Sequence, residues 1–91
     1  QRIRFQINEI SNVVRILLIF PQNIRQTTTW NNSDTVVDLI KYIQRGTVHN
    51  SNICLTINNM VFKTTEAYSY LNQSFLNFNI PNGSEVLVQF F

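Results

Sequence analysis

Charged residues are scarce in this chain of 91 residues. Asp, Glu, Lys and Arg together make up 13% of it, whereas they contribute about 25% of an average soluble domain. The seven basic and five acidic residues give a net charge of +2. The basic ones are scattered, which argues against the positive stripe that nucleic-acid binding requires. A surface with so little charge is covered either by uncharged polar side chains, such as the abundant Asn, or by a partner protein.

Long hydrophobic runs and cysteine pairs are also missing. The longest unbroken apolar run is Ile16–Phe20, far below the ~20 residues that cross a bilayer, so we expect no membrane span. The single cysteine, Cys54, excludes a disulfide within the chain and a cysteine-based zinc site. The absence of a signal-peptide pattern favours an intracellular location without naming a compartment. The start at Gln1 indicates a processed protein or a segment of a longer one.

Catalytic motifs are absent as well. The sequence has no metal-ligand spacing, no glycine-rich phosphate loop and no nucleophile motif. His49, the only histidine, lies in a polar stretch with no nucleophile nearby. Cys54 has no neighbouring Lys or His in the sequence that would activate its thiol. We therefore expect a protein that is not an enzyme and that binds no metal or other cofactor.

What the chain does contain is hydrophobic material in regular patterns. Hydrophobic residues make up 44% of it and include seven Phe, enough for one small core. Short apolar segments with alternating or β-branched residues, bounded by turn signals, predict strands. These strands cover residues 13–20, 24–30, 53–57, 60–62 and 86–90. Residues 1–12 form a separate, strand-like arm, because Ile3, Phe5 and Ile7 alternate with polar residues.

One amphipathic helix is predicted between the second and third strands. Thr35 and Asp38 have the spacing of a capping box, although Ser33 or Asp34 could cap the helix instead. Gly46 is placed to end the helix. Apolar residues recur between these ends with helical spacing, at Val36, Leu39, Ile40 and Ile43. The order of elements predicts an α+β fold, in which one main helix packs across a mixed sheet of four to five strands.

The connection before the last strand holds the remaining hydrophobic residues. Residues 63–73 are polar and irregular in pattern, and three residues could anchor them, namely Tyr68, Tyr70 and Leu71. A compact turn or single helical turn is expected next, around Phe75, Phe78 and Ile80. The run Pro81-Asn82-Gly83-Ser84 is a strong turn signal that precedes the last strand.

The order and spacing of these segments resemble ubiquitin and its relatives over residues 13–90. The helix entry Ser33-Asp34-Thr35-Val36 is similar to that of the family, and so is the third strand with its turn, Leu55-Thr56-Ile57-Asn58-Asn59. Phe75-Leu76-Asn77-Phe78-Asn79-Ile80 resembles the segment before the family's last strand. The resemblance implies a ubiquitin-like β-grasp domain at 13–91, a divergent member of the family that follows the arm at 1–12.

The same resemblance implies a function in protein–protein contact. Ubiquitin-like modifiers end in a flexible tail closing on Gly-Gly, whereas this sequence ends in Val88-Gln89-Phe90-Phe91, so we expect it not to be conjugated as it stands. By the match, the central isoleucine of ubiquitin's recognition patch becomes Thr56, and receptors of ubiquitin should bind poorly. What remains is a non-catalytic interaction module, either an adaptor or structural subunit of a larger assembly or a domain of a longer protein.

Strand parity indicates the surface that such a module would use. If Val14, Ile16 and Leu18 face the helix, the residues between them face the other side of the sheet. The candidate partner-binding residues on that outer face are Leu17, Ile19, Thr56, Leu87, Gln89 and Phe91. This face would be unusually apolar for a free monomer. Either a partner protein covers it, or residues 2–10 of the arm fold back over it as an extra strand or flap.

A basic edge is the alternative interaction site. It would combine Arg25 of the second strand with Lys41 and Arg45 of the helix. Ras-binding domains share the β-grasp fold and use basic residues of that strand and helix against an acidic GTPase, so the resemblance allows a Ras-association-like effector domain. The competing interpretation is a solvated helix face with spaced charges.

Overall fold

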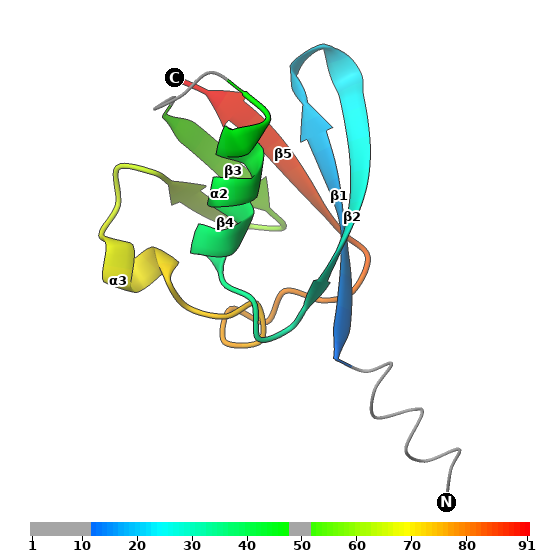
Figure 1. Cartoon of the computed structure of the whole chain (residues 1–91), viewed down its shortest axis with the longest axis vertical. Helices are drawn as coiled ribbons and strands as arrows, with labels where there is room; N and C mark the ends of the chain where they lie inside the picture. The colour runs from blue at the N-terminus through cyan, green and yellow to red at the C-terminus, as the bar shows by residue number, and fades with distance from the viewer. Residues whose placement is uncertain (1–11, 48–51) are drawn as a thin grey trace, which may run out of the picture.

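A five-stranded mixed sheet crossed by one main helix forms the protein (Figure 1). The computed structural model describes residues 12–47 and 52–91. Its strands are β1 (Val13–Phe20), β2 (Ile24–Asn31), β3 (Ile53–Ile57), β4 (Met60–Lys63) and β5 (Ser84–Phe90). Its helices are the 3-10 turn η1 (Pro21–Asn23), the main helix α2 (Val36–Arg45) and the single turn α3 (Tyr68–Leu71).

The strands lie in the order β2-β1-β5-β3-β4. β1 and β5 are parallel, and the other neighbouring pairs are antiparallel. Helix α2 crosses one face of this sheet (Figure 1), and none of the described elements covers the other face, which we call the open face. The α+β fold with one main helix across a mixed sheet, predicted from the sequence, is confirmed with five strands.

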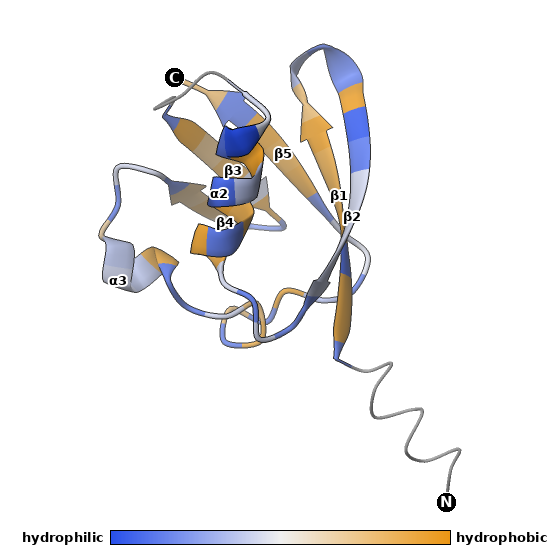
Figure 2. Cartoon of the chain, in the orientation of Figure 1, coloured by the Kyte–Doolittle hydropathy of each residue, from blue (hydrophilic) through white to orange (hydrophobic). Residues whose placement is uncertain are grey.

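Alternation along β1 decides which face is buried. Val14, Ile16 and Leu18 point toward α2 and are at most 4% exposed, whereas the residues between them are only half-buried or exposed. The same period operates in β3 and β5, so each strand adds two or three buried aliphatic side chains to the core. A fully buried side chain of this size stabilises the fold by about 1.5–3 kcal/mol. Figure 2 shows how hydrophobic β1 is compared with the more hydrophilic edge strand β2.

Helix α2 begins and ends where the sequence predicts. The Thr35 hydroxyl accepts a hydrogen bond from the Asp38 backbone N–H at 3.1 Å, and the Asp38 carboxylate accepts one from the Thr35 N–H at 3.0 Å. Thr35, and neither Ser33 nor Asp34, is therefore the N-cap. Gly46 ends the helix with its N–H donating to the Ile43 carbonyl at 3.1 Å. All four predicted core-facing residues of the helix are buried, and Val37 joins them.

The β1–β2 hairpin closes through a turn that needs left-handed backbone. Gln22 and Asn23 have φ values of 65° and 60°, a region that Asn tolerates better than most residues. Pro21 opens the turn, because its fixed φ suits that position and its missing N–H costs no ladder bond there. The hairpin then pairs without a bulge from Phe20 with Ile24 to Val13 with Asn31.

The connection between β4 and β5 is more ordered than predicted. The sequence pattern indicated only irregular chain over residues 63–73. In the structure Lys63 is the last residue of β4, and residues 68–71 form the helical turn α3. Of the three expected anchors, Leu71 is 4% exposed, but Tyr68 is 63% and Tyr70 is 39% exposed. The prediction for Tyr68 was wrong, because a four-residue helix buries only one side chain. The compact turn that follows is confirmed, with Phe75 and Ile80 buried.

Trp30 anchors the end of β2 to the core, on the same side of the strand as the buried Thr28. Its indole N–H donates to the Thr28 hydroxyl at 2.7 Å, and that hydroxyl donates to the Ile16 carbonyl at 2.9 Å. The indole also packs edge-on against Tyr42 and Phe75, with ring centroids 5.6 and 5.9 Å apart. These contacts join β2 to both α2 and the connection before β5.

We expect Thr35→Ala to lower the free energy of unfolding by about 1 kcal/mol, because it removes the acceptor of the capping box. Urea denaturation followed by circular dichroism measures the loss. Thr65→Ala is the matched control, since Thr65 is an exposed loop residue, and it should change stability by less than about 0.5 kcal/mol. Equal effects of the two substitutions would contradict the assigned cap.

A second pair of variants tests the burial pattern of the sheet. Leu55 is fully buried and Leu87 is 43% exposed on the open face. Leu55→Ala should cost about 2–5 kcal/mol of unfolding free energy, because it leaves a cavity in the core. Leu87→Ala should cost less than about 1 kcal/mol. A comparable loss in both variants would mean that the open face is covered within the chain itself.

Candidate functional site

One row of side chains runs across the whole open face. Ile19 of β1 pairs with Leu87 of β5, and Leu87 pairs with Thr56 of β3. Thr56 pairs in turn with Val61 of the edge strand β4. On the other side, Ile19 pairs with Arg25 of the edge strand β2. Side chains at directly paired positions stand on the same face of a sheet, so these five residues form a continuous row.

The middle of this row is apolar and accessible. Leu87 is 43% and Val61 is 47% exposed, while Ile19 and Thr56 are half-buried. Such exposure is ordinary for one isolated residue. Here the two exposed residues stand in one row on either side of Thr56, so the row makes one patch.

Polar residues border the apolar row on both sides. Leu17 extends the apolar area toward the next row, where it pairs with Glu85 of β5 and with Thr27 of β2. In the row on the other side, Cys54 pairs with Gln89 and with Lys63. An apolar centre with a rim of both charge signs is the usual anatomy of a protein–protein interface.

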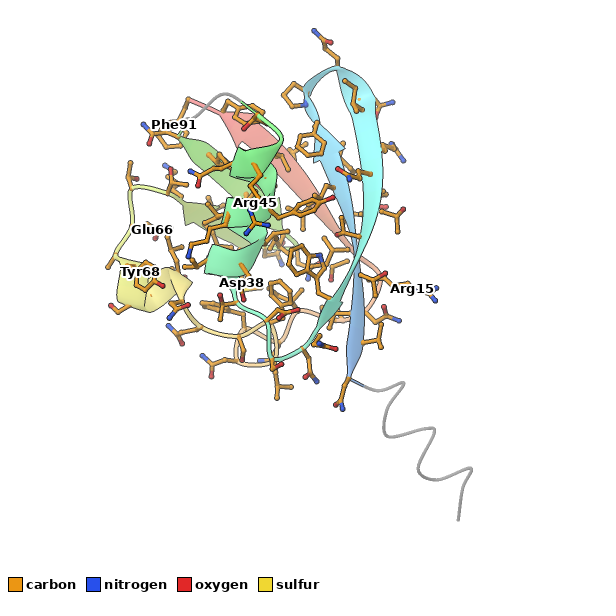
Figure 3. All side chains as sticks on the ribbon, viewed as in Figure 1. Arg15, Asp38, Arg45, Glu66, Tyr68 and Phe91 are labelled. Carbon is orange, nitrogen blue, oxygen red and sulfur yellow. The ribbon has the colours of Figure 1, made fainter. Side chains whose placement is uncertain are left out.

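The structure brings the predicted partner-binding residues to one side of the sheet. Leu17, Ile19 and Leu87 occupy adjacent positions, and Thr56 and Gln89 lie beside them on β3 and β5. Phe91 follows the end of β5, where its N–H donates to the Asn52 carbonyl at 3.0 Å. Its side chain is 60% exposed at the margin of the sheet (Figure 3). Whether these residues bind a partner stays a prediction.

Sequence reasoning missed Val61, which is the most exposed apolar member of the row. The signal was present in the short strand Met60-Val61-Phe62, because Phe62 is fully buried and its neighbour must face the opposite side. A strand of four residues shows too little alternation to assign a face until the pairing with β3 is known.

The three residues of the predicted basic edge lie on different surfaces. Arg25 belongs to the open-face row, and its Nε donates to the Asn23 side-chain oxygen at 3.1 Å. Arg45 lies on the opposite side of β2, at the end of α2, and Lys41 is exposed one turn earlier on that helix. A shared surface for an acidic partner would have to reach around the β2 edge. The GTPase interpretation stays a prediction.

A groove lies on the helix side of the sheet, between the β1–β2 hairpin and the end of α2. It has a volume of about 720 Å³. Residues that line it include Phe20, Ile24, Gln26, Tyr42, Arg45 and Phe90. Phe90 has the same strand parity as the buried Val86 and Val88, yet it is 39% exposed. The reason is that it lies at the end of the sheet and borders this groove instead of the core.

Within residues 12–47 and 52–91, no three His, Cys, Asp or Glu side chains are placed to hold a metal ion together. His49 and the arm residues before Asn12 lie outside the described residues, so the structure does not address the flap or the loop histidine. None of the described helices is long and apolar enough to span a membrane.

Comparison with known proteins identifies the fold. No protein-family model and no curated protein sequence matches the chain. Solved structures do match, with low sequence identity. A ubiquitin-like domain of an Arabidopsis thaliana protein superposes with a TM-score of 0.67 at 15% identity, over 87% of this chain and 78% of that domain.

Two further structures are ubiquitin-like domains of tubulin cofactors. The C-terminal ubiquitin-like domain of mouse tubulin-specific chaperone e has a TM-score of 0.62 at 13% identity, over 89% of both chains. The ubiquitin-like domain of tubulin-binding cofactor B has a TM-score of 0.58 at 13% identity, over 85% of this chain and 88% of that one. Strand order, the single crossing helix and these superpositions together establish that this chain has the ubiquitin-like β-grasp fold.

Proposed function

We propose that this protein is a non-catalytic interaction module that binds a partner protein through its open sheet face. The observation that carries the proposal is the continuous row from Ile19 through Leu87 and Thr56 to Val61, in which only the Thr56 hydroxyl is polar. Its neighbours on the sheet supply both a wider apolar area and a polar rim. Apolar side chains that gather on an exposed surface are typical of a site that a partner protein covers.

The energetics of that contact follow from the exposures. Leu87 and Val61 are already about half-covered in the free chain, so each gains only part of the ~1.5–3 kcal/mol of a fully buried aliphatic side chain. Binding therefore depends on a partner that supplies its own apolar or aromatic anchors to the centre of the row. Arg25, Glu85 and Lys63 at the rim add orientation and specificity more than affinity.

Thr56 gives this surface a selectivity of its own. It stands at the centre of the row, between Leu87 and Val61, at the position that corresponds to ubiquitin's central isoleucine by the resemblance in sequence. A partner that buries Thr56 must also accept or satisfy its hydroxyl, because an unpaired buried hydroxyl costs about 1–3 kcal/mol. Receptors with a wholly apolar pocket at this point are disfavoured.

The similar structures support the coarse form of the proposal. Ubiquitin-like domains occur in a tubulin-specific chaperone and a tubulin-binding cofactor. Both of those proteins are named for their action on another protein, tubulin. For this chain we propose a role as an adaptor or as a subunit of a larger assembly. A second candidate, an effector domain for an acidic GTPase, draws support from the exposure of Lys41 and Arg45 on successive turns of α2.

The test replaces both exposed aliphatic residues of the row. We expect Leu87→Ser combined with Val61→Ser to reduce recovery of a stoichiometric partner by about tenfold or more in a native affinity purification. The reason is that the two most exposed apolar contacts of the row are lost. Quantitative mass spectrometry of the recovered complex measures the effect, and circular dichroism checks that the variant is folded.

Leu76→Ser is the matched control, because Leu76 is 63% exposed but lies in the connection before β5 and outside the open face. It should leave recovery of the partner unchanged. If the folded double variant recovers the same complex as the natural sequence, the open face is not the binding surface. Loss of the partner from an Arg45→Glu variant alone would move the interaction to the helix side.

A further inference from the structure

The turn that leads into β5 contains the one Asn-Gly sequence of the chain, Asn82-Gly83. An asparagine that precedes glycine is especially prone to lose its side-chain amide, because glycine has no Cβ to shield its backbone nitrogen. Ser84, the next residue, is 5% exposed, whereas Asn82 and Gly83 are themselves exposed. Water and hydroxide therefore reach these two residues, and burial does not protect them.

Two hydrogen bonds to one residue of β1 hold both of the groups that would react. The Asn82 side-chain oxygen accepts a hydrogen bond from the Arg15 backbone N–H at 2.7 Å. The Gly83 N–H donates to the Arg15 carbonyl at 2.8 Å. Only the backbone of Arg15 makes these two contacts, and its exposed side chain projects outward (Figure 3). A bonded N–H gives up its proton when the bond opens, which is why the hydrogen exchange of amides reports local opening.

The loss of the side-chain amide requires these bonds to open. Hydroxide removes the proton from the Gly83 nitrogen, which then bonds to the side-chain carbonyl carbon of Asn82. The bond from that carbon to the side-chain nitrogen breaks, and the nitrogen leaves as ammonia with a proton from water, which regenerates the hydroxide. Water then opens the cyclic imide. Opening at the side-chain carbonyl gives aspartate, and opening at the main-chain carbonyl gives isoaspartate, in which the main chain runs through the side-chain carbon.

We propose that Asn82 is a spontaneous modification site whose conversion to isoaspartate is controlled by the pairing of β1 with β5. While Gly83 stays bonded to Arg15, the imide does not form, and each opening of this end of the sheet allows the reaction. Isoaspartate adds one carbon, about 1.5 Å, to the main chain, in the turn that sets Ser84 opposite Ile16. The modified chain therefore cannot close again in the same register, and the opening becomes irreversible.

The experiment compares the folded and the unfolded full chain at mildly alkaline pH, without urea and in enough urea to unfold it. Peptide mass spectrometry follows the conversion of each asparagine, and chromatography separates aspartate from isoaspartate. In urea, Asn82 should react before every other asparagine. In the folded chain its conversion should be at least about tenfold slower, because only the open fraction reacts. Hydrogen exchange of the Gly83 N–H, measured by NMR, should be slowed by the same factor to within about threefold.

Three variants test the cause. Ile16→Val should speed conversion in the folded chain by about threefold or more and leave the rate in urea unchanged, because the loss of a buried methyl group beside Ser84 favours opening. Thr65→Ala, at an exposed loop position, is the control and should change neither rate. Gly83→Ala should slow conversion in urea by about tenfold or more, because its Cβ shields the nitrogen. That last comparison is made in the unfolded chain, so it does not require the variant to fold.

Two rate measurements would overturn the proposal. One is conversion of the folded chain as fast as in urea, since the bonds to Arg15 would then give no protection. The other is an unchanged folded rate in Ile16→Val. The isolated isoaspartate form should unfold at a lower urea concentration than the Asn82→Asp variant, which has the same charge and an unaltered main chain. Equal midpoints would show that the modification leaves the register of β5 intact.

Discussion

The parallel pairing of β1 with β5 is the contact on which the rest of the structure depends. It joins the first and last described strands, and the turn before β5 sets its register. The Arg15 N–H donates to the Asn82 side-chain oxygen at 2.7 Å, and the Gly83 N–H donates to the Arg15 carbonyl at 2.8 Å. Gly83 has a φ of 88°, which suits glycine. With this register, Ile16 and Leu18 lie beside Ser84 and Val86 under α2.

The same register creates the open face as an unavoidable consequence. A strand that buries every second residue presents the others to the opposite side, and only one described helix long enough to cover a sheet is available. Leu17, Ile19 and Leu87 are therefore left outside the core. The β2 edge results from the strand order, which places a long hairpin strand at the end of the sheet.

Local sequence signals were sufficient to predict those features that are held by contacts between residues close in the sequence. The capping box of Thr35 with Asp38 depends on contacts within a few residues, and the sequence predicted it correctly. The helical turn α3 was missed because its only buried residue, Leu71, carries no periodic pattern. Tyr70 stays half in water although its ring packs against Phe62 and Phe78, contacts between residues that the sequence alone does not connect.

The two-residue period showed that Ile19, Leu87 and Thr56 face away from the helix, because the side-chain direction in a strand is a property of the local backbone. Only the tertiary structure decided that these residues meet in one row. It also decided that Val61 stands at the end of that row. Backbone hydrogen bonds between strands are much the same for any side chains, so a sequence pattern predicts a face but not a neighbour. The groove beside β2 has the same origin, since its walls come from the hairpin, α2 and β5, which only packing brings together.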